Sequence, residues 1–168
     1  MPTTAVRDPA RIHIFEGTDG VGKTTIATMD ATARSAVYLH AEKPQHNTWF
    51  DEYVKPLTRP DKSYTCDRWH IGEIVWPKLF GRKPLFNNVD EYIECCVSLA
   101  TLGAEVHLMI RPLSQIEKEL KRRGESRREI RYSLQAQEMF VQIAELTSNY
   151  MPVSIWTAAT LLNSTRKD

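Results

Sequence analysis

A glycine-rich stretch near the start of the chain carries the residue types that bind phosphate groups. It contains the pattern Gly-x-x-x-x-Gly-Lys-Thr at residues 17–24. Glycines let the backbone turn tightly, so that successive amide groups point at phosphate oxygens, and a helix that follows adds its positive end. Lys23 can reach the β- and γ-phosphates of ATP, and the Thr24 hydroxyl can bind Mg²⁺. The pattern therefore predicts a P-loop whose ATP-binding residues are Gly17, Thr18, Asp19, Gly20, Val21, Gly22, Lys23, Thr24 and Thr25.

Asp67 and Arg68 form a second polar group, directly after a strand expected at residues 63–66. An arginine at a strand end can bind phosphate oxygens through two hydrogen bonds, and a neighbouring carboxylate can hold magnesium or its water. Such a pair on its own is usually a surface ion pair. Combined with a P-loop, it predicts that Thr24 and Asp67 hold Mg²⁺ and that Asp67 and Arg68 are catalytic together with Lys23.

Residues 117–131 hold seven basic and four acidic side chains. Such a run usually forms a solvated helical face with many ion pairs. Here Gly124 and the two residues after it interrupt the helix between two pairs of arginines, which indicates a hinged lid at residues 121–131. A lid of this kind can close arginines over a transferring phosphoryl group. Arg123 and Arg127 flank the interruption, and we predict that they are the catalytic arginines of the lid.

Three further residues are candidates for binding a phosphoryl acceptor. Glu42 follows a strand expected at residues 36–39, and it can act as a base for a hydroxyl acceptor or be a solvated loop carboxylate. Trp69 adjoins the Asp-Arg pair and can stack on a nucleobase, although aromatic side chains on helices more often belong to a core. Glu73, one helical turn later, faces either the same cleft or the solvent.

The elements that would position these residues alternate between strands and helices. Strands are expected at residues 11–15, 36–39, 63–66, 105–110 and 152–156, with helices at 21–34, 48–54, 69–80, 89–102, 112–123 and 132–150. This alternation predicts an α/β fold with a mainly parallel sheet that helices cover on both faces. Ligands bind such sheets beyond the carboxyl ends of the strands. The P-loop, Glu42 and the Asp-Arg pair all fall at those ends.

The composition excludes several other classes of protein. A net charge of +1 leaves no general basic surface, which makes nucleic acid an unlikely partner. The three cysteines and five histidines show no metal-ligand spacing, so we assign no metal to them. Residues 1–10 lack an apolar signal core and suit a loose terminus, and no stretch is long enough to span a membrane. We expect one domain over residues 1–168 in the cytoplasm, or in the host cytoplasm if the chain is viral.

Three motifs in this order resemble the thymidylate kinase family. Residues 15–25 match its P-loop, Phe-Glu-Gly-x-Asp-Gly-x-Gly-Lys-Thr-Thr, at every fixed place. Residues 67–69 are similar to its Asp-Arg-aromatic motif, and residues 121–128 to its arginine-rich lid. The resemblance implies a P-loop three-layer sandwich with a five-stranded parallel sheet in the order 2-3-1-4-5. It also implies magnesium-dependent transfer from ATP to a deoxynucleoside monophosphate in nucleotide biosynthesis, and a homodimer.

The segment after the second strand departs from that family. Such kinases commonly carry Arg-Glu-Pro-Gly-Gly there, whereas residues 41–45 read Ala-Glu-Lys-Pro-Gln. Deoxynucleoside kinases place their catalytic base where Glu42 stands. The acceptor therefore stays open between a monophosphate, which the P-loop match favours, a deoxynucleoside, which Glu42 favours, and a hydroxyl of a modified base or nucleic acid. A P-loop ATPase or nucleotide-binding switch without an acceptor is the alternative outside the kinases.

Overall fold

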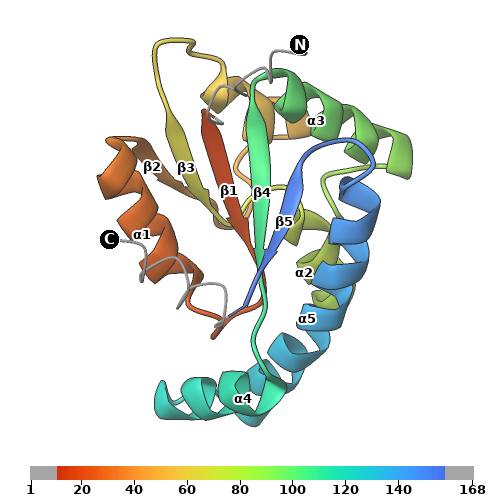
Figure 1. Cartoon of the computed structure of the whole chain (residues 1–168). Helices are drawn as coiled ribbons and strands as arrows, with labels where there is room; N and C mark the ends of the chain where they lie inside the picture. Colours follow the sequence, from red (N-terminus) through yellow and green to blue (C-terminus); the bar gives the residue numbers. More distant parts are fainter. Residues whose placement is uncertain (1–10, 158–168) are drawn as a thin grey trace, which may run out of the picture.

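A five-stranded, fully parallel sheet forms the centre of the protein (Figure 1). The computed structural model describes residues 11–157, so the loose terminus expected at residues 1–10 lies outside the described part. The strands lie in the order β2-β3-β1-β4-β5, which confirms the predicted architecture. Their bounds are β1 Ile12–Glu16, β2 Val37–His40, β3 Tyr64–Asp67, β4 Ala104–Met109 and β5 Val153–Trp156.

Helices cover both faces of this sheet. Helix α1 lies on one face, and α2, α3 and α5 lie on the other (Figure 1). The bounds are α1 Lys23–Arg34, α2 Gly72–Phe80, α3 Val89–Thr101, α4 Leu113–Arg122 and α5 Arg127–Thr147, with a short π-helix at Phe50–Val54 and a 3-10 turn at Lys55–Leu57. None of the helices within residues 11–157 is long and apolar enough to cross a lipid bilayer.

Strand β1 shows how the sequence builds two cores. Its side chains alternate, so Ile12 and Ile14 are fully buried in the core beneath α2, α3 and α5. Phe15 points to the opposite face and packs in a second core with Ala27 of α1 and Ile116 of α4. A strand that is buried on both faces needs apolar residues at successive positions, as parallel sheets generally do. Because β1 is central, the loop after it is held between rigid layers.

Three of the α-helices begin two or more residues away from the predicted position, for identifiable reasons. Gly22 has φ 90°, a left-handed conformation that delays α1 from residue 21 to Lys23. Arg68 also has a positive φ of 61°, and α2 begins only at Gly72 instead of residue 69. Helix α5 begins at Arg127, five residues earlier than predicted, because Ser126 and Glu129 form a capping box.

Candidate active site

The P-loop connects β1 to α1, and two of its glycines have no room for a side chain. Gly17 has φ 141°, and a Cβ atom there would lie 2.5 Å from the carbonyl oxygen of Met109 on β4. Gly20 has φ 84°, and a Cβ there would lie 3.2 Å from the side chain of Leu120 on α4. Larger residues would have to displace backbone at the first position. The loop is therefore fixed by β4 below and α4 beside it.

Lys23 is buried beneath the loop. Its ammonium group donates a hydrogen bond to the Thr18 carbonyl at 2.9 Å and lies 4.0 Å from Asp19 Oδ1. Burial lowers the pKa of Lys23 to about 8, although Asp19 favours the charged form. The Thr18 hydroxyl is fully buried and donates to the Ser133 carbonyl of α5 at 2.6 Å, so this side chain braces the loop and only its backbone faces a ligand. A cation held in so buried a place is well suited to phosphate.

Thr24 and Asp67 meet at the carboxyl ends of β1 and β3, as predicted for a metal site. The Thr24 hydroxyl donates to Asp67 Oδ2 at 2.6 Å, and Tyr38 and His40 of β2 also hydrogen-bond this oxygen at 2.8 and 3.1 Å. Burial alone would raise the pKa of Asp67, but these hydrogen bonds lower it, so the group is a carboxylate. The buried Oδ1 atom has no hydrogen-bond partner among residues 11–157. A hydroxyl and a carboxylate are hard oxygen ligands that fit Mg²⁺.

Arg68 links the Asp-Arg motif to the P-loop. Its guanidinium donates to Asp19 Oδ1 at 2.7 Å, and its backbone amide donates to the Phe15 carbonyl at 3.0 Å. The left-handed backbone at Arg68 turns its side chain toward the loop instead of continuing the strand. The structure thus brings Lys23, Thr24 and Arg68 together, although they come from two separate motifs.

Beside these residues lies a pocket of about 380 Å³. Trp76 and Phe80 of α2 line it with stacked rings whose centroids are 5.7 Å apart. Trp69 is also part of the wall, but it is buried and its indole nitrogen donates to the Tyr53 carbonyl at 3.0 Å, which makes it a fixed support. The more exposed face for a planar ligand is therefore that of Phe80. Among the aromatic residues that follow the Asp-Arg pair, sequence reasoning preferred Trp69 to Trp76 and Phe80 as the residue that stacks on a nucleobase.

The two glutamates predicted for the acceptor have different environments. Glu42 is exposed on the pocket wall, and no hydrogen bond or ion pair of its carboxylate occurs among residues 11–157. Glu73 is buried, and both of its oxygens accept hydrogen bonds from Arg82 at 2.9 Å. It also accepts from the amide of Leu85. The Glu73 carboxylate therefore holds Arg82 and the turn after α2, and it does not lie at the surface.

The helix interruption expected in the basic segment is present between α4 and α5. Gly124 has φ 80°, and the exposed Arg123 donates to Glu119 at 2.9 Å. Arg127 is exposed at the first position of α5. No contact within residues 11–157 joins either arginine to Lys23 or Asp67, so their role as lid residues stays a prediction. Arg111, which was not predicted, does contact the P-loop, where it donates to the Gly20 carbonyl at 3.1 Å.

Glu16 is a further residue that sequence reasoning missed. It ends β1, is fully buried, and its Oε1 accepts hydrogen bonds from the amides of Trp69 and Ile71 at 3.0 and 2.9 Å. The carboxyl group thereby holds the segment that follows Arg68 against the P-loop strand. Burial raises the pKa of Glu16 from 4.5 to about 7, against the effect of these amides and of Lys23. A charged residue in an otherwise apolar strand was the available signal, because such a residue must find partners.

Replacing Glu16 by glutamine should change how stability depends on pH. Between pH 4.5 and about 7 the folded protein keeps a proton on Glu16 that the unfolded chain has lost, so this group makes stability fall as pH rises. Glu16→Gln removes that loss, which amounts to at most about 3 kcal/mol. Urea unfolding of both proteins at several pH values should show that the free energy of unfolding of the variant increases relative to that of the wild type as pH rises. If the free energies of unfolding of the variant and the wild type changed in parallel with pH, as we expect for the exposed control Glu138→Gln, the raised pKa of Glu16 would be contradicted.

Comparison with known proteins identifies this fold in solved structures. No protein-family model matches the chain, and no curated protein matches its sequence. The YorR protein from Bacillus subtilis, in complex with phosphorylated GDP, matches with a TM-score of 0.70 and 19% identity over 88% of this chain and 86% of YorR. Deoxyadenosine kinase from M. mycoides with bound dCTP matches with a TM-score of 0.56 and 17% identity over 92% of this chain and 97% of the kinase. These likenesses show a shared fold.

Proposed function

We propose that the protein is a kinase that transfers the γ-phosphoryl group of ATP to a deoxynucleoside or a deoxynucleotide. The observation that carries this proposal is the convergence of Lys23, the Thr24–Asp67 pair and Arg68 beside an aromatic pocket. The P-loop supplies donor binding, and the pocket supplies a separate place for a second, planar substrate. The fold shared with a deoxyadenosine kinase agrees with such a reaction.

Each group of residues has a separate role in in-line phosphoryl transfer. Backbone amides of the loop and Lys23 hold the donor phosphates. Thr24 with Asp67 would hold Mg²⁺, which would supply neutralising charge to these phosphates. Arg68 exchanges its Asp19 partner for a phosphate oxygen. Closure of the lid then brings Arg123 and Arg127 to the transferring group and excludes water.

The charges around the pocket favour a hydroxyl acceptor. Arg82 is bound by Glu73 and Arg68 is bound by Asp19, so each pair is internally neutralised. The other charged residues of the pocket wall are Lys43 and Glu42, which are neighbours of opposite charge. The pocket thus has no excess of positive charge for a monophosphate, while Glu42 is available as a base for a hydroxyl group. We therefore place a deoxynucleoside first among the acceptors.

A deoxynucleoside monophosphate is the second candidate. The close match of residues 15–25 to the thymidylate kinase P-loop favours it, and Arg68 can bind an acceptor phosphate once it leaves Asp19. The cytoplasmic location expected from the sequence and the homodimer implied by the same resemblance stay predictions.

A panel of acceptors distinguishes these alternatives. Purified protein with Mg²⁺ and ATP labelled in the γ-phosphate is incubated with each deoxynucleoside, each monophosphate and a single-stranded oligonucleotide. We expect label to appear on a deoxynucleoside at least about tenfold faster than on its monophosphate. The reverse preference would establish a deoxynucleoside monophosphate kinase, and a thymidylate kinase-like function if dTMP is the best acceptor. Transfer only to the oligonucleotide would overturn the proposal, and so would ATP hydrolysis whose rate no acceptor changes.

A further inference from the structure

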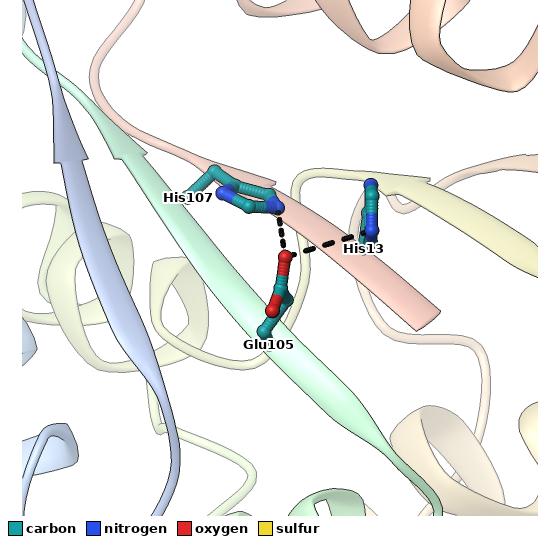
Figure 2. Close-up of side chains that lie close together, drawn as sticks. All are labelled: His13, Glu105 and His107. Atoms are coloured by element: carbon teal, nitrogen blue, oxygen red, sulfur yellow. Dashed lines mark ion pairs between the residues drawn. The ribbon is translucent and has the colours of Figure 1, made fainter. Parts of the chain in front are cut away.

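Two histidines and a glutamate come together on the face of the sheet that carries α1, away from the P-loop. His13 of β1 lies opposite Glu105 of β4, and His107 is two residues further along the same strand. Residues two apart on a strand share a face, so all three side chains converge (Figure 2). Glu105 Oε1 is 3.0 Å from His107 Nε2 and 3.5 Å from His13 Nε2. The three nearest ligand atoms lie within 4.8 Å of one another.

These distances suit a small tetrahedral metal ion. Zinc bonds of 2.0–2.1 Å to nitrogen and oxygen place neighbouring ligand atoms about 3.4 Å apart. The two measured separations, 3.0 and 3.5 Å, lie on either side of that value. The Glu105 side chain is 31% exposed, so it can adjust and leaves a route for the ion and for a water ligand.

The outer nitrogens of both rings have hydrogen-bond partners, as they do in metal sites. His13 Nδ1 lies 2.9 Å from Asp30 Oδ1 on α1, and His107 Nδ1 lies 2.8 Å from Ser154 Oγ on β5. A carboxylate only accepts, so His13 carries its proton on Nδ1. The Ser154 hydroxyl can donate to the Val106 carbonyl at 3.4 Å and so accept from His107 Nδ1. Histidines that bind metals usually donate their second N–H in this manner.

With protons on both Nδ1 atoms, which their partners allow, the Nε2 atoms of the neutral rings carry lone pairs close to Glu105 Oε1. His107 Nε2 is buried and makes no hydrogen bond among residues 11–157, even though it lies 3.0 Å from Oε1. In this tautomer both atoms are acceptors, so they repel each other at that distance and a cation between them would relieve the repulsion. Two histidine nitrogens close to one carboxylate oxygen are the arrangement expected of a metal site without its ion.

We propose that His13, Glu105 and His107 bind one zinc ion that links β1 to β4. Imidazole and carboxylate together suit zinc, whereas magnesium prefers oxygen ligands alone. Iron(II) uses the same ligand set but needs several open positions, and here Phe15 and Trp156 pack against His107 with ring centroids 4.9 and 5.1 Å away. His13 and Glu105 lie near the amino ends of their strands, so the ion would be structural and separate from the transfer site.

Metal titration tests this site without reference to kinase activity. Protein freed of metal with a chelator is titrated with Zn²⁺ in excess Mg²⁺, and bound zinc is counted by mass spectrometry after dialysis. We expect one zinc ion per chain and a rise in the melting temperature. Co²⁺ in place of zinc should give the visible absorption of a tetrahedral site with nitrogen and oxygen ligands.

Glu105→Gln and His46→Ala form the matched pair of variants. Glutamine keeps the shape of Glu105 and removes its charge, and zinc affinity should fall at least about tenfold. His46 is exposed in the loop after β2, and its loss should leave binding unchanged. The proposal would be overturned if the wild type retained no zinc. Equal binding by Glu105→Gln would also overturn it, because that outcome would place the ion elsewhere, for example at His40 and Asp67. His107→Ala, if it folds, should also lose the ion.

Discussion

Lys23→Ala is expected to reduce phosphoryl transfer by about 10³-fold or more, with the fold retained. Lys23 is the buried cation of the P-loop, and its ammonium group is held within the loop by the Thr18 carbonyl. In the transition state, negative charge spreads over the γ-phosphoryl oxygens, and a fixed cation in a water-poor site stabilises that charge strongly. Water that enters the space left by the side chain cannot replace the charge. Transfer of label from ATP to the best acceptor measures the loss.

The fold should survive this substitution because the ammonium group is costly to bury. Burial lowers the pKa of Lys23 to about 8, so its charged form is destabilised at neutral pH and the change to alanine removes that cost. Lys23→Met keeps most of the side-chain volume and should be as inactive as the alanine variant while leaving no cavity. Lys55→Ala removes an exposed lysine whose ion pair within residues 11–157 is with Asp51, and this variant should keep full activity. Normal turnover by either Lys23 variant would refute the active-site assignment.

The parts of the candidate site that could be outlined from the sequence depend on short-range patterns. The P-loop is defined by residues within a few positions of each other, and so is the interruption at Gly124. The sheet order was implied by the family resemblance, and the structure confirms it. Thr24 and Asp67 could be paired in advance because both follow parallel strands, whose carboxyl ends share one edge of a sheet.

The remaining features depend on contacts between distant segments. Glu16 was missed because its partners are amides that follow β3, and nothing in the spacing of residues shows where those amides lie. Glu73 was expected to face either the cleft or the solvent, and its pairing depends on a turn after α2 that returns Arg82 to it. The His13–Glu105–His107 cluster shows no metal-ligand spacing because the register between β1 and β4 creates it. Patterns along one strand cannot specify what faces a residue on the next.

Glu42→Gln should separate the two leading acceptors. A deoxynucleoside presents a protonated hydroxyl, and a carboxylate that takes this proton in the transition state accelerates transfer by about 10²–10⁴-fold. A monophosphate is already an anion and gains nothing from a base. We therefore expect the variant to lose about 10²-fold or more in kcat with a deoxynucleoside, and to change by no more than about threefold with a monophosphate. Glutamine keeps the size and polarity of the side chain, so pocket shape does not explain such a split.

The structure explains why Glu42→Gln should leave the rest of the site unchanged. Glu42 is exposed, and its carboxylate has no hydrogen bond or ion pair within residues 11–157, so its charge supports no other part of the site. Glu94→Gln, an exposed change on α3, is the matched control and should leave both activities intact. Steady-state kinetics with a deoxynucleoside and its monophosphate, at saturating ATP, give both ratios for all three proteins. Equal activity of Glu42→Gln and wild type on the deoxynucleoside would exclude Glu42 as the base. The acceptor would then be bound by the cations of the wall, Arg68 and Lys43, which is the arrangement that a monophosphate requires.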